Sequence, residues 1–123
     1  AQKVYNFIFT NKNLPEDLVP YWDFDAPNIP NEPRDSSAAA CTASALYEME
    51  NYLPGNDYKV TADKIMESLG SPAYRAAVGT NGNFILMHSV GSIPHDSEID
   101  VPLNYADYYF LEGLMRKRDM EKK

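Results

Sequence analysis

The stretch that decides the fold runs from Asp35 to Gly55 and reads DSSAAACTASALYEMENYLPG. A helix-capping residue, Asp35 or Ser36, precedes an alanine-rich run, and the pair Pro54-Gly55 ends it. We therefore predict a helix from about residue 35 to residue 53. The alanines in its first half imply that neighbouring helices approach it closely.

Three further helices are predicted around this one. The first begins with the chain itself, and the pattern suggests that the chain starts inside a helix, on apolar residues at helical spacing: Val4, Tyr5, Ile8 and Phe9. Another runs from about Asp57 to Leu69 with Gly70 as its C-terminal cap, burying Tyr58, Ala62, Ile65, Met66 and Leu69. The last runs from Pro102 or Leu103 to Arg116 and buries a stripe of Leu103, Ala106, Phe110 and Leu114.

The connections between these helices alternate in length. Residues 14–33 form a long loop with five prolines, residues 51–56 a short one, and residues 71–101 a long one that contains a strand-like run, Asn83 to His88. Consecutive antiparallel helices place alternate connections at opposite ends, so both long loops should emerge at the same end. The predicted class is all-α, about four helices of a helical toroid or solenoid whose elaborated end carries the site.

Composition and charge narrow the possible functions. The chain is 44% hydrophobic and 24% charged, which is typical of a globular domain. A net charge of −7 argues against nucleic acid as a partner, and the absence of a long apolar stretch argues against a membrane. The single cysteine, Cys41, is expected to pack as a small apolar residue and supports neither a disulfide framework nor a cysteine-type zinc site.

The first long loop and the residue that follows it hold four candidate binding residues, Tyr21, Trp22, Asp23 and Arg34. Asp23 and Asp25 alternate, so in an extended segment their carboxylates share one side, with the neighbouring aromatics on the other. Carboxylates beside an exposed Trp22 suit a sugar, and Tyr21 and Arg34 complete the set. Alternative roles are internal: Asp23 and Asp25 as turn-forming acceptors, and Arg34 in an internal ion pair, with Asp23 as a possible partner. Asp35 is predicted to cap its helix.

The second long loop groups His88, Ser89 and Ser92 around Gly91, and this group predicts a sugar-binding or anion-binding surface or, equally, an ordinary polar loop. The spacing of His88 and His95 matches no metal-ligand pattern, so no metal site is predicted. A catalytic triad drawn from His88 and Ser89 would be arbitrary without a G-x-S-x-G motif.

Two long motifs, in order, resemble a known family. They are PEDLVPYWDFDAP at residues 15–27 with PRDSSAA at 33–39, and GNFILMHSVGS at 82–92 running into IDVPLNYADYYFLE at 99–112. Together they resemble the C-terminal third of the unsaturated glucuronyl hydrolases, glycoside hydrolase family 88. The resemblance implies an (α/α)6 barrel, of which residues 1–123 would be the C-terminal portion of a single catalytic domain, and it covers the chain except the basic tail after Arg116.

The family's activity is implied by the same resemblance. Its members remove Δ4,5-unsaturated uronic acid from lyase-generated oligosaccharides by hydrating a vinyl ether, using acid–base aspartates and neither a metal nor an organic cofactor. Those aspartates are expected upstream, so no catalytic residue is assigned here and the chain alone should be inactive. Its partners would be the oligosaccharide and the remainder of its own barrel, with the N-termini of two helices suited to an anionic uronate.

The resemblance also bears on the substrate. Ser89 and Ser92 match the two serines of a Ser-x-x-Ser-x-Lys loop that holds sulfate in some members, but Pro94 stands in the place of the lysine, which predicts a preference for unsulfated substrates. A rhamnogalacturonyl hydrolase and a non-catalytic sugar-binding or assembly module remain alternatives. The bacterial periplasm and the cytoplasm both stay open as compartments.

Overall fold

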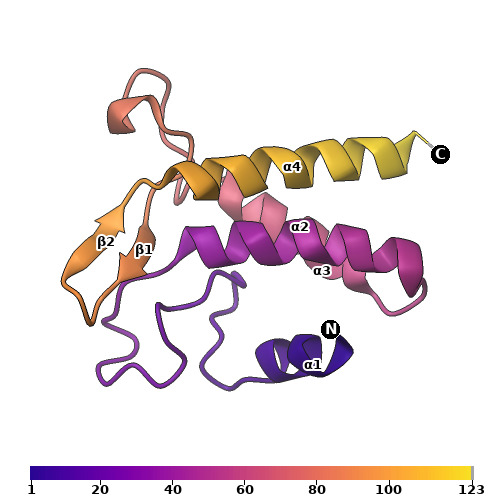
Figure 1. Ribbon diagram of the computed structural model, residues 1–123, viewed down its shortest axis with the longest axis horizontal. Helices are drawn as coiled ribbons and strands as arrows, with labels where there is room; N and C mark the ends of the chain where they lie inside the picture. The colour runs from indigo at the N-terminus through magenta and orange to yellow at the C-terminus, as the bar shows by residue number, and fades with distance from the viewer. Residues whose placement is uncertain (123) are drawn as a thin grey trace.

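The computed structural model describes residues 1–122, which form four α-helices, one 3-10 turn and a small antiparallel hairpin. The elements are α1 (Gln2–Phe9), α2 (Ser36–Tyr52), α3 (Tyr58–Gly70), η1 (Asn81–Asn83), β1 (Ser89–Ser92), β2 (Ser97–Val101) and α4 (Asn104–Glu121). Successive helices run in alternate directions, and both long connections lie at one end, on the left of Figure 1. The predicted arrangement of the loops is therefore confirmed, and the fold is mostly helical rather than all-α.

Helix α2 lies at the centre and packs against both α3 and α4. It begins where predicted because the Asp35 side chain caps it, accepting a hydrogen bond from the Ser37 amide. Ala40 and Ala43 are fully buried, which agrees with the close helix approach expected from the alanine-rich run. The largest buried side chains around α2 are Tyr47, Tyr58, Ile65, Leu69 and Leu86.

Helix α4 continues five residues beyond its predicted end at Arg116. The basic residues there are bound to the other helices: Arg116 donates to the Ser44 carbonyl at 2.8 Å, and Lys117 pairs with Asp63 at 3.1 Å. These contacts to α2 and α3 stabilise turns that the sequence alone had marked as a tail.

The buried stripe of α4 also differs from the predicted one. Gly113 is buried, whereas Leu114 is 41% exposed. A Cβ atom at Gly113 would lie 3.2 Å from the Met66 sulfur, so the missing side chain lets α4 lie close to α3 at this point.

The strand-like run from Asn83 to His88 forms no regular strand, only an isolated antiparallel bridge between Leu86 and Arg75. Asn83 and His88 both have positive φ, which is incompatible with an extended strand, and the hairpin forms just after them from β1 and β2. Residues 72–87 instead fold back on themselves, with the Ala76 amide bound to the Ile85 carbonyl and the Met87 amide to the Tyr74 carbonyl. This segment, called the arm below, projects beyond α4 in Figure 1.

Two smaller expectations are also corrected. Gly70 is the last residue of α3 rather than the residue beyond it. Cys41 is exposed, because no described element covers the side of α2 that carries it. Across residues 1–122, no helix combines the length and the apolar character needed to cross a membrane.

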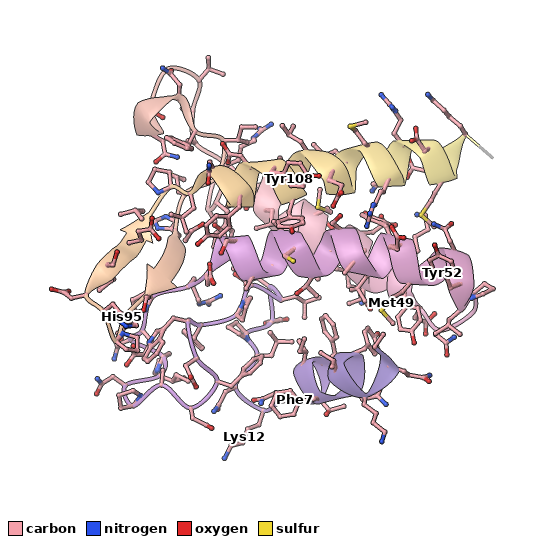
Figure 2. All side chains as sticks on the ribbon, viewed as in Figure 1. Phe7, Lys12, Met49, Tyr52, His95 and Tyr108 are labelled. Atoms are coloured by element: carbon pink, nitrogen blue, oxygen red, sulfur yellow. The ribbon has the colours of Figure 1, made fainter. Side chains whose placement is uncertain are left out.

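One helical face stays uncovered by the described residues. It comprises exposed side chains of α2 and α4, and Figure 2 labels two of them, Tyr52 and Tyr108. We call it the α2/α4 face and define it by Cys41, Ala45, Tyr52, Tyr108, Leu111 and Met115. Glu48, Glu112 and Arg116 form ion pairs along the seam between the two helices.

Candidate functional site

The two long loops meet at the start of α2. The Ser36 amide donates to the His88 carbonyl at 2.9 Å, and the Ser36 hydroxyl donates to the Met87 carbonyl at 2.7 Å. The same hydroxyl lies 2.7 Å from the Ser89 hydroxyl, and both serines are fully buried. Ser89 therefore joins β1 to α2 and presents no surface of its own.

Asp35 ties the hairpin to the same helix. Its Oδ1 atom accepts from the Ser37 amide at 3.1 Å, from the Ser37 hydroxyl at 2.6 Å and from the Val90 amide at 3.2 Å. The predicted helix cap is confirmed. Because the amides of Ser36 and Ser37 are both bound within the protein, the first two donors of α2 are not free for a uronate, contrary to the expectation from the sequence.

Arg34 is held inside the first loop. Its Nη1 atom donates to Asp17 Oδ1 and to the Val19 carbonyl, each at 2.8 Å, and reaches the Tyr74 hydroxyl at 3.2 Å. The guanidinium also lies over the Tyr21 ring, 4.8 Å from its centroid, and Tyr21 is buried beneath it.

The internal ion pair of Arg34 is therefore made with Asp17, and the suggested partner Asp23 is wrong. Asp23 is occupied elsewhere, because its Oδ1 accepts from the Asp25 amide at 2.7 Å and closes a tight turn. The turn-forming alternative is thus confirmed for Asp23.

The Asp17–Arg34–Tyr74 group is electrostatically coupled. Burial alone would raise the pKa of Asp17, but hydrogen bonds from Tyr74, the Val19 amide and Arg34 outweigh it and hold that pKa below its usual value. Burial and the neighbouring Asp17 carboxylate raise the pKa of Tyr74, so the phenol stays a donor. The group links the first loop to the beginning of the arm.

Trp22 lies at a hollow that Arg34 does not line. Its indole nitrogen donates to Glu32 Oε2 at 2.7 Å, and its ring lines a hollow of about 190 Å³ together with Asp23, Phe9 and Ala38. This hollow lies between α1, the first loop and α2. Trp22 is only half-buried, so part of the ring remains accessible.

His88 directly precedes β1, and Ser92 is the last residue of that strand. His88 Nδ1 lies 2.6 Å from Asp100 Oδ1, and Ser92 Oγ lies 2.7 Å from His95 Nδ1 at the turn of the hairpin. His88 lines an open cleft of about 430 Å³ with Arg34, Tyr74 and Asp100. The predicted residues thus fall into four places: Arg34 and His88 at the cleft, Tyr21, Trp22 and Asp23 at the hollow, Ser89 at the buried junction of α2 and β1, and Ser92 at the turn.

Tyr105, in the first turn of α4, was not among the predicted site residues. It is 42% exposed and lies beside Ser37, Glu98 and Asp35. Burial, and then the negative charges of Glu98 and Asp35, raise its pKa, so its hydroxyl remains protonated at neutral pH. The sequence offered one indication that Tyr105 could belong to the site: it follows the second long loop directly, at the start of α4.

Metal ligands are not gathered at this end. Within residues 1–122, no three His, Cys, Asp or Glu side chains lie close enough together to hold an ion. The polar groups that converge here are instead hydrogen-bond donors and acceptors, partly exposed beside aromatic rings. Such a surface suits a hydroxyl-bearing ligand.

Comparisons with known proteins find relatives over nearly the whole chain. The chain is 46% identical over 120 residues to an unsaturated glucuronyl hydrolase of Formosa agariphila, covering 98% of this chain and 30% of that protein. It is 35% identical over 113 residues to an unsaturated chondroitin disaccharide hydrolase of Streptococcus agalactiae, covering 88% and 28%. No model of a known protein family matches the chain.

Solved structures extend the similarity to three dimensions. A crystal structure of an unsaturated glucuronyl hydrolase specific for heparin superposes with a TM-score of 0.95 and 45% identity, over 100% of this chain and 33% of that one. The Streptococcus agalactiae unsaturated glucuronyl hydrolase superposes with a TM-score of 0.81 and 33% identity, over 94% and 31%. The chain therefore spans about a third of the length of the relatives it matches.

At these levels of identity the chain is homologous to a segment of carbohydrate-degrading hydrolases. These relatives are unsaturated glucuronyl hydrolases, so the resemblance is confirmed as homology to a segment that makes up about a third of their length.

Proposed function

We propose that the protein carrying this chain is a glycosidase that removes Δ4,5-unsaturated uronic acid from lyase-generated oligosaccharides. The observation that carries the proposal is the superposition of the whole chain, loops included, on an unsaturated glucuronyl hydrolase at 45% identity. The reaction would be hydration of the vinyl ether: a carboxylic acid protonates the double bond, water adds at the adjacent carbon, and the resulting hemiketal collapses to release the sugar.

The four helices would be the C-terminal part of an (α/α)6 barrel. Helices α2 and α4 run in the same direction and pack side by side, while α1 and α3 run in the opposite direction (Figure 1). The uncovered α2/α4 face, with Tyr108 60% exposed and Met115 55% exposed, suits packing against the remainder of such a barrel.

The acid–base aspartates would come from that remainder. At the loop end of this chain, Asp17, Asp23 and Asp35 each accept hydrogen bonds from protein donors and hold a loop or helix in place. A carboxylate engaged in this way is poorly suited to exchanging protons with a substrate. The chain would therefore supply one wall of the binding site and none of the catalytic acids.

For direct contact with the oligosaccharide we propose the accessible side chains Trp22, Asp23, Arg34, His88 and Ser92. Two other candidates, Tyr21 and Ser89, are buried in this arrangement. They would contribute through the residues they hold, Arg34 and the β1 strand. We add Tyr105 to these candidates because it lies at the start of α4, directly after the second long loop.

The test is a turnover measurement with the intact protein and an unsaturated uronyl disaccharide, followed by the loss of the ultraviolet absorbance of the double bond. We expect turnover by the intact protein and none by residues 1–123 alone. Turnover by the 123-residue chain would overturn the placement of catalysis elsewhere. If the intact protein binds the disaccharide without turning it over, it is a non-catalytic sugar-binding module. If it is active only on substrates in which the uronate precedes rhamnose, it is a rhamnogalacturonyl hydrolase.

A further inference from the structure

The arm contains a tight turn built on an Asn-Gly pair. Asn81, Gly82 and Asn83 form η1, and all three have positive φ, at 55°, 60° and 66°. Asparagine and glycine adopt this left-handed region more readily than other residues, so the sequence suits the turn. Gly82 is exposed and carries no side chain, and nothing on this residue shields its backbone nitrogen from the side chain that precedes it.

The Asn81 side chain holds the returning limb of the arm. Its Nδ2 atom donates to the Phe84 carbonyl at 3.2 Å and to the Leu86 carbonyl at 3.0 Å. The same limb is also bound to α4, because the two carboxylate oxygens of Asp107 accept from the amides of Ile85 and Leu86 at 2.8 Å and 2.9 Å. The two carbonyls need a donor, and residue 81 supplies one only as long as it is an amide.

An asparagine that precedes glycine lies next to a nucleophile of its own backbone. The lone pair of the Gly82 nitrogen attacks Asn81 Cγ, so that an N–Cγ bond forms and the Cγ–Nδ2 bond breaks. Nδ2 leaves as ammonia with the proton that the Gly82 nitrogen gives up, and a five-membered succinimide ring remains. Solvent water then opens the ring at either of its carbonyls, which yields aspartate or isoaspartate at position 81. Reactions of this kind make asparagine one of the thermolabile residues.

The closed arm opposes this reaction. Nδ2 is bound to two carbonyls, so the Asn81 side chain has to leave both of them before it turns toward the Gly82 nitrogen. Opening of the arm removes this constraint, and the exposed residues 77–80 are typical of a segment that opens at low cost. The product does not restore the closed state, because a carboxylate at position 81 has no proton to donate and brings negative charge against both carbonyls.

We propose that Asn81 is a modification site, at which spontaneous deamidation converts a held arm into a released one. The conversion occurs when the arm opens, and it is irreversible because ammonia is lost. The site is independent of the proposed function, since it needs neither a ligand nor turnover. The fraction of molecules with a released arm therefore increases with the age of the protein.

The experiment uses the intact protein, incubated at mildly alkaline pH either folded or unfolded in urea, and peptide mass spectrometry locates the deamidated residue. Asn83 is the matched control, because it lies in the same turn with positive φ but precedes Phe84 rather than glycine. We expect product at Asn81 and not at Asn83 in the folded protein, formed about 5- to 100-fold more slowly than in urea, since two hydrogen bonds must first break.

Two outcomes of this incubation would contradict the proposal. Equal rates at Asn81 in the folded and the unfolded protein would overturn its protection by the closed arm. Absence of product at Asn81 in the folded protein after about a hundred unfolded-state half-times would overturn the site itself.

Asn81→Asp tests the release of the arm directly. This variant lacks the two hydrogen bonds, so proteolytic cleavage within residues 77–80 should become about 5- to 100-fold faster. Asn83→Asp introduces the same charge in the same turn and should change cleavage by less than about twofold. Equal cleavage of the two variants would overturn the release. Cleavage of wild-type protein before and after ageing gives the same comparison, so the test stays decisive if Asn81→Asp fails to fold.

Discussion

Ser36 and Ser89 are 53 positions apart in the chain, yet their hydroxyl oxygens lie 2.7 Å apart at the junction between α2 and β1, where neither residue is exposed. Ser89→Ala should cost about 1–2 kcal/mol in the free energy of unfolding, because it leaves a buried hydroxyl with one partner fewer. Ser36→Ala should cost more, since it also leaves the Met87 carbonyl unpaired. Urea denaturation of both variants and of the double variant measures the coupling, and strictly additive losses would argue against the contact.

Asp17 should make the free energy of unfolding depend on pH in the acidic range. Its pKa is lower in the folded protein than the unperturbed value of 3.8, so the stabilisation is fully present above that value and is lost as the pH falls through the depressed folded pKa. Asp17→Asn should therefore cost about 1–3 kcal/mol at pH 6, and the difference from the wild type should shrink below about pH 4. Urea denaturation between pH 6 and strongly acidic conditions is the measurement. A difference that stays constant over this range would show that charge plays no part.

Position 113 should tolerate alanine in place of glycine but not a larger side chain. Alanine favours helix by about 1 kcal/mol over glycine, but its Cβ would lie 3.2 Å from the Met66 sulfur, so Gly113→Ala should change stability by less than about 1 kcal/mol. Gly113→Leu should destabilise by about 1–3 kcal/mol because the larger side chain forces α4 away from α3. Exposed Leu114→Ala is the comparison for general helix effects. Equal stability of the alanine and leucine variants would mean that α4 does not lie against Met66.

The α2/α4 face should cause the 123-residue chain to self-associate when it is prepared alone. Leu111 and Met115 are 48% and 55% exposed on that face, so Leu111→Lys with Met115→Lys should reduce association without lowering the free energy of unfolding by more than about 0.5 kcal/mol. Val78→Lys, at a fully exposed position of the arm, is the control. Sedimentation measures the outcome, and a monomeric wild-type chain would contradict it.

Substrate choice should respond to the turn of the hairpin. Ser92 is hydrogen-bonded to His95, and Pro94 beside it offers no cation. We expect the intact protein to prefer unsulfated unsaturated disaccharides, and Pro94→Lys to shift kcat/KM toward sulfated ones by about tenfold, the gain from one charge-assisted hydrogen bond. Pro94→Ala is the control, because it removes the proline ring without adding a charge. Because Ser89 is fully buried, only Ser92 of the two matching serines can meet a ligand, and a wild-type preference for sulfated substrate that survives Ser92→Ala would rule out this use of the loop.

The helices were predictable because local pattern decides them. The Asp35 cap, the alanine-rich run and the Pro54-Gly55 stop act within a few residues of one another, and α2 begins and ends within one residue of its prediction. The end of α4 was missed for the opposite reason. Its last turns depend on contacts of Arg116 and Lys117 with helices distant in the sequence.

The sequence predicts that both long loops lie at one end of the helices, but it does not predict which residues of these loops contact one another. Alternating loop lengths predicted where the loops meet, since that follows from helix direction alone. The choice of Asp17 rather than Asp23 as the partner of Arg34 depends on how the proline-rich loop folds back, as does the position of Trp22 against Glu32. The hairpin of β1 and β2 was not predicted, because the strand-like run was expected to extend to His88, and the positive φ that ends it there cannot be read from a residue that rarely adopts it.

The bonds between α2 and the hairpin have a mechanical consequence. The Ser36 amide holds the carbonyl of His88, and the Asp35 carboxylate holds the amide of Val90, so the base of β1 is clamped to the first turn of the helix. The hairpin therefore cannot swing open as a flap unless that turn unwinds. The arm has no such clamp at its tip, where residues 77–80 are exposed. Rearrangement on ligand entry is thus cheaper at the tip of the arm, and the hairpin behaves as a fixed extension of α2.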